Sequence, residues 1–167
     1  AAVTMRSASH FALVVNGVYT SHVARPRVII AAQDANVAVK VIAALNPKRY
    51  RVEHIFDWSE ALLRAELVLA HTAVIHAPEM DAALLKRCEK STYRALTLVF
   101  ITTDSAIRAA AIQLDARTVD VPLSRTELKR TVFRAVSDAH AMRSLGQRGE
   151  PNTSGLRLTR SNPQGAP

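Results

Sequence analysis

Five short apolar runs, each followed by a helical pattern, fill residues 27–142 and limit the fold more than any other feature. The runs lie at 27–32, 50–56, 72–76, 96–101 and 118–121. A strand and a helix that alternate with short connections require a parallel sheet, because each helix returns the chain to the same edge. The pattern predicts an α/β domain with helices on both faces of the sheet and right-handed crossovers.

Capping residues predict where several helices begin and end. Asn46-Pro47 ends the first helix, because a residue before proline avoids helical backbone angles. Asp57-Trp58-Ser59-Glu60 resembles a capping box and opens a helix through about Leu67. Ser124-Arg125-Thr126-Glu127 is a full capping box, and the apolar stripe after it predicts a helix that fades past Met142.

Two further helices are predicted between the third and fifth strands. Residues at helical spacing follow the third strand, and they are Met80, Ala83, Leu84, Arg87 and Cys88. Cys88 is therefore predicted to be a core side chain and not a nucleophile. Thr102-Thr103-Asp104 can cap an alanine-rich helix that runs to Leu114.

Two segments flank the predicted domain of residues 27–142. In residues 1–26, Asn16-Gly17 lies between two β-prone runs, which is a strong hairpin signal. An isolated hairpin is only marginally stable, so a disordered leader is the alternative. Residues 143–167 are rich in Gly, Pro, Ser, Asn, Gln and Arg, which predicts a flexible basic tail or a severed linker.

Charge and composition exclude several classes of function. The formal net charge is +8, but the two ends of the chain carry most of it, and only 5% of residues are aromatic. A nucleic-acid-binding domain would usually have a dense basic face with stacking aromatic residues. No apolar run reaches the roughly 18–20 residues that span a bilayer, and no cleavable leader is evident. With its single cysteine, the chain is predicted to be cytoplasmic.

The sequence lacks the common motifs of cofactor, metal and hydrolase sites. Its six histidines show neither HxH nor HExxH spacing, which argues against a zinc site. Residues 28–140 contain no glycine, so no loop there resembles a phosphate-binding loop. We expect no bound cofactor or metal and no enzymatic activity.

The carboxyl ends of the predicted strands are where a site should lie, as in other open α/β sheets. The third run, Thr72–His76, ends at a histidine, and a proline turn follows it. Asp34 and Thr102 come just after the first and fourth runs. A ligand site for a nucleotide or other small molecule, or an enzyme, at these three residues is one hypothesis.

Three local motifs resemble those of response-regulator receiver domains. They are Pro78-Glu79-Met80-Asp81-Ala82, Phe100-Ile101-Thr102-Thr103, and Val121-Pro122-Leu123-Ser124 with Glu127-Leu128 downstream. The resemblance covers about residues 27–142. It implies a flavodoxin-like, doubly wound (βα)5 fold with strand order 2-1-3-4-5, preceded here by an N-terminal extension.

The resemblance also implies which positions should carry the phosphorylation site. Receivers use two acids after the first strand, an aspartate ending the third, a Thr or Ser after the fourth, and a lysine after the fifth. The acids and the aspartate hold Mg²⁺. In this sequence the two acid positions are Ala32 and Gln33, with Asp34 next, and the aspartate position is His76. The Thr or Ser position is Thr102 and the lysine position is Val121. The aromatic switch position on the fifth strand is Thr118. Counting back from Pro78 gives Val74 in place of His76.

Only Thr102 matches the receiver pattern, which predicts a pseudo-receiver that has lost phosphotransfer. Simpler roles are open for the other polar residues: Asp34 and Thr102 as helix caps, and His76 as a hydrogen-bonded strand-end residue or a phosphoacceptor. The predicted function is signalling by phosphorylation-independent contact with a histidine kinase, another regulator or a second copy. The alternative is a regulatory fragment of a transcription regulator or hybrid kinase.

In receivers the partner surface is usually the fourth helix, fifth strand and fifth helix, which implies residues 104–142 here. Homodimerisation through this segment is one expectation, because an alanine-rich helix permits close approach of another helix. Four basic residues could steer a partner to this face, and they are Arg108, Arg125, Lys129 and Arg134. They could equally be solvated surface residues.

Overall fold

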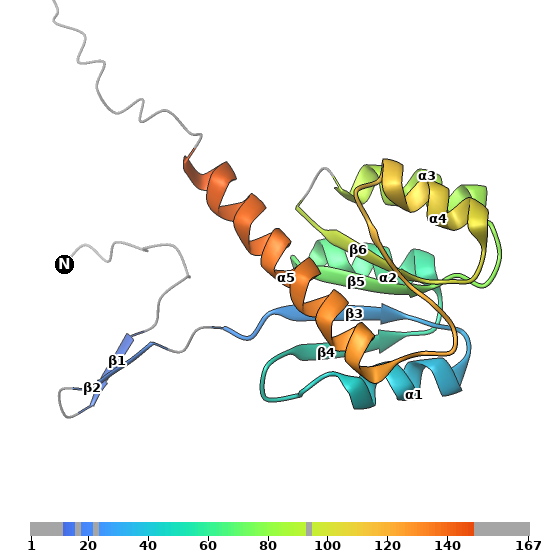
Figure 1. Cartoon of the computed structure of the whole chain (residues 1–167). Helices are drawn as coiled ribbons and strands as arrows, with labels where there is room; N and C mark the ends of the chain where they lie inside the picture. Colours follow the sequence, from blue (N-terminus) through green and yellow to red (C-terminus); the bar gives the residue numbers. More distant parts are fainter. Residues whose placement is uncertain (1–11, 16–17, 22–23, 93–94, 149–167) are drawn as a thin grey trace, which may run out of the picture.

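The computed structural model describes residues 12–15, 18–21, 24–92 and 95–148 (Figure 1). Strands β1 (Ala12–Val15) and β2 (Val18–Ser21) pair antiparallel, with Val15 opposite Val18. The predicted turn at residues 16–17 lies outside the described residues, as do residues 149–167 of the predicted tail. The limits predicted for the extension and the tail therefore stay predictions, apart from the end of the last helix described below.

Five strands and five helices alternate through the rest of the described chain. The strands are β3 (Arg27–Ala31), β4 (Arg51–Ile55), β5 (Thr72–His76), β6 (Thr97–Ile101) and β7 (Arg117–Val119). The helices are α1 (Ala35–Ala44), α2 (Trp58–Leu67), α3 (Ala82–Thr92), α4 (Ser105–Gln113) and α5 (Arg125–Arg148).

The strands form one parallel sheet in the order β4-β3-β5-β6-β7. Numbered within the domain, this is the order 2-1-3-4-5, so the predicted flavodoxin-like fold is confirmed. β3, β5 and β6 are almost entirely buried because helices cover both faces of the sheet. β4, an edge strand, is exposed or partly exposed along its whole length, without the strict alternation of a strand with one wet face.

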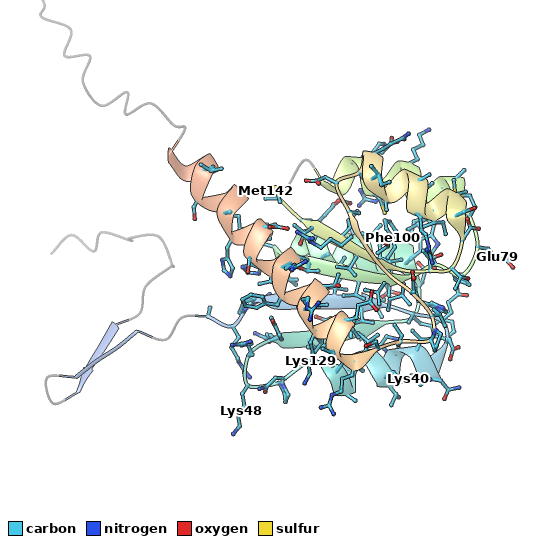
Figure 2. The ribbon with its side chains drawn as sticks, in the orientation of Figure 1. Lys40, Lys48, Glu79, Phe100, Lys129 and Met142 are labelled. Carbon is cyan, nitrogen blue, oxygen red and sulfur yellow. The ribbon has the colours of Figure 1, made fainter. Side chains whose placement is uncertain are left out.

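Two apolar layers lie on opposite faces of the sheet. Helices α1 and α5 cover one face, and helices α2, α3 and α4 cover the other (Figure 1). Phe100 of β6 is fully buried and lies in the interior in Figure 2, whereas Lys40, Lys48 and Lys129 point outward. Cys88 is buried in the second layer, as predicted, and burial raises the pKa of its thiol to about 12.

Helix caps agree with the sequence at most positions. The Asp57 carboxylate accepts a hydrogen bond from the Glu60 N–H at 2.9 Å, and α2 ends at Leu67. The Ser124 Oγ accepts from the Glu127 N–H at 3.4 Å. The third helix begins later than predicted, because Asp81 accepts from the N–H groups of Ala83 and Leu84 and so caps α3 after Met80.

Helix α5 runs to Arg148, so the prediction that it ends near Met142 is wrong. Arg143 holds the extra turns against the domain. Its guanidinium lies 3.1 Å from His71 Nε2 and donates to the Leu69 carbonyl oxygen at 3.0 Å and to the Ala70 carbonyl oxygen. The composition of residues 143–167 could not reveal these contacts, because their acceptors lie some 70 residues earlier in the chain.

The fifth strand is also shifted from its prediction of 118–121. β7 ends at Val119, opposite Ile101. Asp120, the next residue, forms an ion pair with Arg108 of α4 at 2.6 Å, and Pro122, two residues later, has no N–H to donate to a neighbouring strand. No helix among the described residues is both long and apolar enough to span a bilayer.

Candidate functional site

The carboxyl ends of all five strands of the parallel sheet lie at one edge of the sheet. Ala31 pairs with Ile75, His76 with Ile101, and Ile101 with Val119. The pairing continues one residue further, because Ala77 N–H donates to the Ile101 carbonyl and Thr102 N–H to the Val119 carbonyl, both at 3.1 Å. Residues that follow different strands are therefore held side by side.

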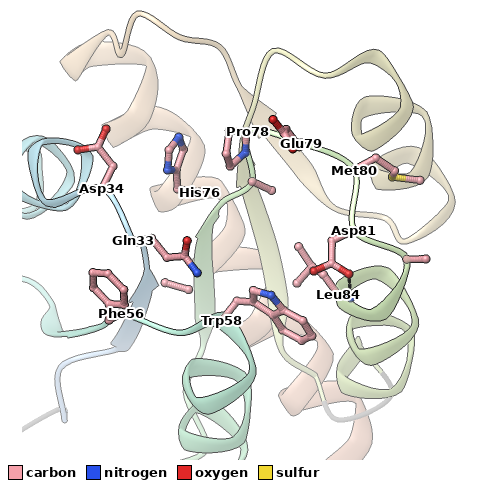
Figure 3. Close-up of a pocket in the computed structure, with 13 residues that line it drawn as sticks. Gln33, Asp34, Phe56, Trp58, His76, Pro78, Glu79, Met80, Asp81 and Leu84 are labelled. Atoms are coloured by element: carbon pink, nitrogen blue, oxygen red, sulfur yellow. Dashed lines mark hydrogen bonds between the residues drawn. The ribbon is translucent and has the colours of Figure 1, made fainter.

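A pocket of ≈ 830 Å³ opens at this edge; we call it the strand-end pocket (Figure 3). It is lined by Ala31, Gln33, Asp34, Phe56, Trp58, His76, Ala77, Pro78, Glu79, Met80, Asp81, Ala82 and Leu84. Of the residues predicted for the site, Gln33, Asp34 and His76 line this pocket. Ala32, Thr102, Thr118 and Val121 do not.

Asp34 is the N-cap of α1. Its Oδ1 accepts hydrogen bonds from the N–H groups of Asn36 at 2.8 Å and Val37 at 3.4 Å. These bonds satisfy amide groups that the first turn of a helix leaves unpaired. Asp34 therefore serves as a helix cap, one of the roles that the sequence left open. Its other oxygen, Oδ2, remains for other contacts.

His76 is the last residue of β5 and is half-buried. Burial lowers the pKa of its imidazole, and the nearby Asp34 carboxylate opposes this by favouring the charged form. Burial is the larger effect. His76 is therefore neutral at pH 7, with one ring nitrogen able to accept a hydrogen bond.

Thr102 serves the start of α4. It is 1% exposed, and its Oγ1 accepts a hydrogen bond from the Asp104 N–H at 3.0 Å. Asp104 then caps the helix by accepting from the N–H groups of Ala106 and Ile107. The Thr102 hydroxyl thus has a structural role, and the N-cap is two residues later.

The remaining predicted positions are Thr118 on β7, Val121 after β7 and Ala32 after β3. Thr118 is half-buried and pairs with Phe100. Val121 is 43% exposed and lies beyond the end of the strand. Ala32 is buried and pairs through its N–H with the Ile55 carbonyl at 3.3 Å.

Sequence reasoning missed the aromatic and acidic walls of the pocket. Phe56 and Trp58 follow β4, and Glu79 and Asp81 follow β5. These residues come just after strands that end at the same edge of the sheet, and this position in the sequence could have indicated that they line the pocket. Among the described residues, no group of three or more His, Cys, Asp or Glu side chains could hold a metal ion.

The predicted partner face spans α4, β7 and α5. Arg125, Lys129 and Arg134 are exposed, and Ile112 on α4 is 81% exposed. Arg108 differs from the other three because it pairs with Asp120 at 2.6 Å. This ion pair leaves Arg108 less available to a partner.

No protein-family model and no curated protein matches this sequence. Solved structures do resemble it. A pilus assembly-related protein of Burkholderia pseudomallei shares 25% identity over 68% of this chain and 90% of its own, with a TM-score of 0.57.

Two receiver domains are similar in structure at lower identity. A CheY-like response regulator receiver domain of Methanospirillum hungatei matches with a TM-score of 0.62 and 14% identity over 71% of this chain and 99% of its own. The receiver domain of an HD domain-containing protein of Pseudomonas fluorescens matches with a TM-score of 0.60 and 22% identity, over 70% and 98%.

Proposed function

We propose that this chain, which has the fold of response-regulator receiver domains, is a pseudo-receiver that signals through protein contact without phosphorylation. The observation that carries the proposal is the set of residues at the strand ends. In the register that the resemblance implies, the positions of the two acids are Ala32 and Gln33, with Asp34 next. The phosphoacceptor position is His76, or Val74 when counted from Pro78, and the lysine position is Val121.

The electrostatics of the strand-end pocket argue against a phosphoryl group there. Its lining includes the carboxylic acids Asp34, Glu79 and Asp81 but neither lysine nor arginine. A transferred phosphoryl group needs cationic or metal partners for its developing charge. His76 is a neutral nucleophile without such a partner among the residues that line the pocket.

The exposed basic residues of α5 support a protein partner. Arg125, Lys129 and Arg134 of α5 are exposed and positively charged, and Ile112 of α4 is an exposed apolar side chain. Such charges speed the approach of an acidic surface, and an exposed apolar side chain gains free energy when it is covered. The partner is a histidine kinase, another regulator or a second copy of the chain.

The likeness to a pilus assembly-related protein makes components of pilus-assembly systems the first candidates to test as partners. Sedimentation velocity on the native chain and on an Ile112→Glu variant identifies a second copy as partner. A dimer that dissociates in the variant would place the homodimer contact on this face.

The decisive experiment is incubation with acetyl phosphate and Mg²⁺, followed by intact-mass measurement. We expect no phosphorylated species, while a functional receiver domain in the same mixture is labelled. Because Trp58 lines the pocket and is the single tryptophan, its fluorescence should also stay constant when beryllofluoride and Mg²⁺ are added. Stoichiometric labelling of the native chain would overturn the proposal.

A further inference from the structure

We propose that the strand-end pocket binds an arginine side chain presented by an extended segment of a protein partner. This inference rests on the proposed function, since it gives the lost phosphorylation site a role in partner recognition. The pocket combines negative charge with aromatic walls, and a guanidinium group is the biological cation that matches both.

The charge of the pocket is opposite to that of the chain. Asp34, Glu79 and Asp81 line it without a lysine or an arginine, although the formal net charge is +8. The field inside a cleft is dominated by the charges that line it. A cationic group is therefore attracted to this site.

The amino termini of α1, α2 and α3 open at the pocket, which taken alone would favour an anion. Each already has its own carboxylate, Asp34 on α1, Asp57 on α2 and Asp81 on α3. Of these, Asp34 and Asp81 line the pocket, and both cap through Oδ1 alone, so each keeps an oxygen for a further donor. Glu79 is exposed and adds charge that no cap offsets.

The carboxylates surround the pocket and do not converge on one point. Figure 3 shows Asp34 on one side and Glu79 and Asp81 on the other, with His76 between them. Among the described residues no three acidic or histidine groups are close enough to hold a metal ion. A planar group with five N–H donors can reach separated acceptors that a single ion cannot.

Aromatic side chains provide the flat surfaces that guanidinium groups stack on. Phe56 is 63% exposed and Trp58 is half-buried, and both line the pocket. The neutral His76 offers an acceptor at the end of β5. A volume of ≈ 830 Å³ exceeds one side chain, so residues on either side of the arginine can enter as well.

The test is a titration of the full chain with a blocked peptide, acetyl-Ala-Arg-Ala-amide, followed by Trp58 fluorescence and calorimetry. The matched control peptide contains citrulline, which has nearly the same shape without the charge. We expect saturable binding of the arginine peptide, weakened by salt, and none of the citrulline peptide. Glu79→Gln should weaken binding about tenfold, and Glu127→Gln, on α5, should not change it.

Equal binding of the two peptides, no binding of either, or an unchanged affinity in Glu79→Gln would overturn the inference. Methylguanidinium binding as tightly as the peptide would also overturn it, because the site would then serve a small organic cation. The labelling experiment with acetyl phosphate is scored separately. A chain that is neither labelled nor bound by peptide remains a pseudo-receiver whose partner binds elsewhere.

Discussion

Acidification should destabilise this protein through His71, which precedes β5. His71 Nδ1 lies 3.3 Å from the Arg27 N–H, and Nε2 lies 3.1 Å from the Arg143 guanidinium. The ring centroids of His71 and His140 are 4.5 Å apart. Burial, then the charges of Arg143, His140 and Arg27, lower the pKa of His71 from 6.5 to about 4.

Proton linkage gives the sign and size of the change in unfolding free energy with pH. Between pH 6.5 and about 4 the unfolded chain binds a proton at His71 that the folded chain does not, so stability falls as the pH falls through this window. A fully buried group with these two pKa values would contribute about 3 kcal/mol. Solvent screening at a half-buried site reduces the expected loss to about 1–2 kcal/mol.

The assay is urea unfolding of the native chain and of His71→Gln at several pH values from 7.5 to 4. Glutamine keeps a polar side chain at this position but does not titrate. Carboxylates titrate in both proteins, so the difference between the two isolates His71. Parallel stability profiles for the two proteins across the whole range would refute the reasoning.

Three further predictions test the core, the cysteine and a cap. Phe100→Ala, at a fully buried position, should lower the free energy of unfolding by about 3–5 kcal/mol, and Phe133→Ala, which is 51% exposed in the native chain, should cost far less in the same urea titration. Cys88, buried with a thiol pKa of about 12, should react with Ellman's reagent at pH 8 only after denaturation, and prompt reaction of the native chain would contradict its placement. Asp57→Ala removes the cap of α2 and should cost about 1 kcal/mol, measured by thermal unfolding, whereas an unchanged midpoint would mean that the cap contributes nothing.

Part of the candidate site could be predicted because its residues follow strands. His76 ends β5 and Asp34 comes three residues after β3, so a parallel sheet places both at one edge. The same logic failed to single out Phe56, Trp58 and Glu79. An aromatic or acidic side chain can lie in the core, on the surface or in a pocket wall. Only the folded arrangement of the loops shows that these three line the pocket.

Errors at the ends of elements have a common cause. Near the end of α5, Arg143 donates to the Leu69 carbonyl oxygen, and just after β7, Asp120 forms an ion pair with Arg108. Neither contact can be predicted from the spacing of apolar residues in the sequence. Composition after Met142 indicated a tail, whereas distant acceptors stabilise further helix.

The sequence by itself determined the number, kind and order of the elements in the domain. Apolar periods and caps act within a few residues, so they can be read locally, as the Asp57 cap shows. Tertiary structure decided the charge balance of the strand-end pocket and the contact between Arg143 and His71, which are 72 residues apart. These properties depend on how distant segments pack against one another, because solvent exposure and the distance between charges are set only when the sheet and its helices come together.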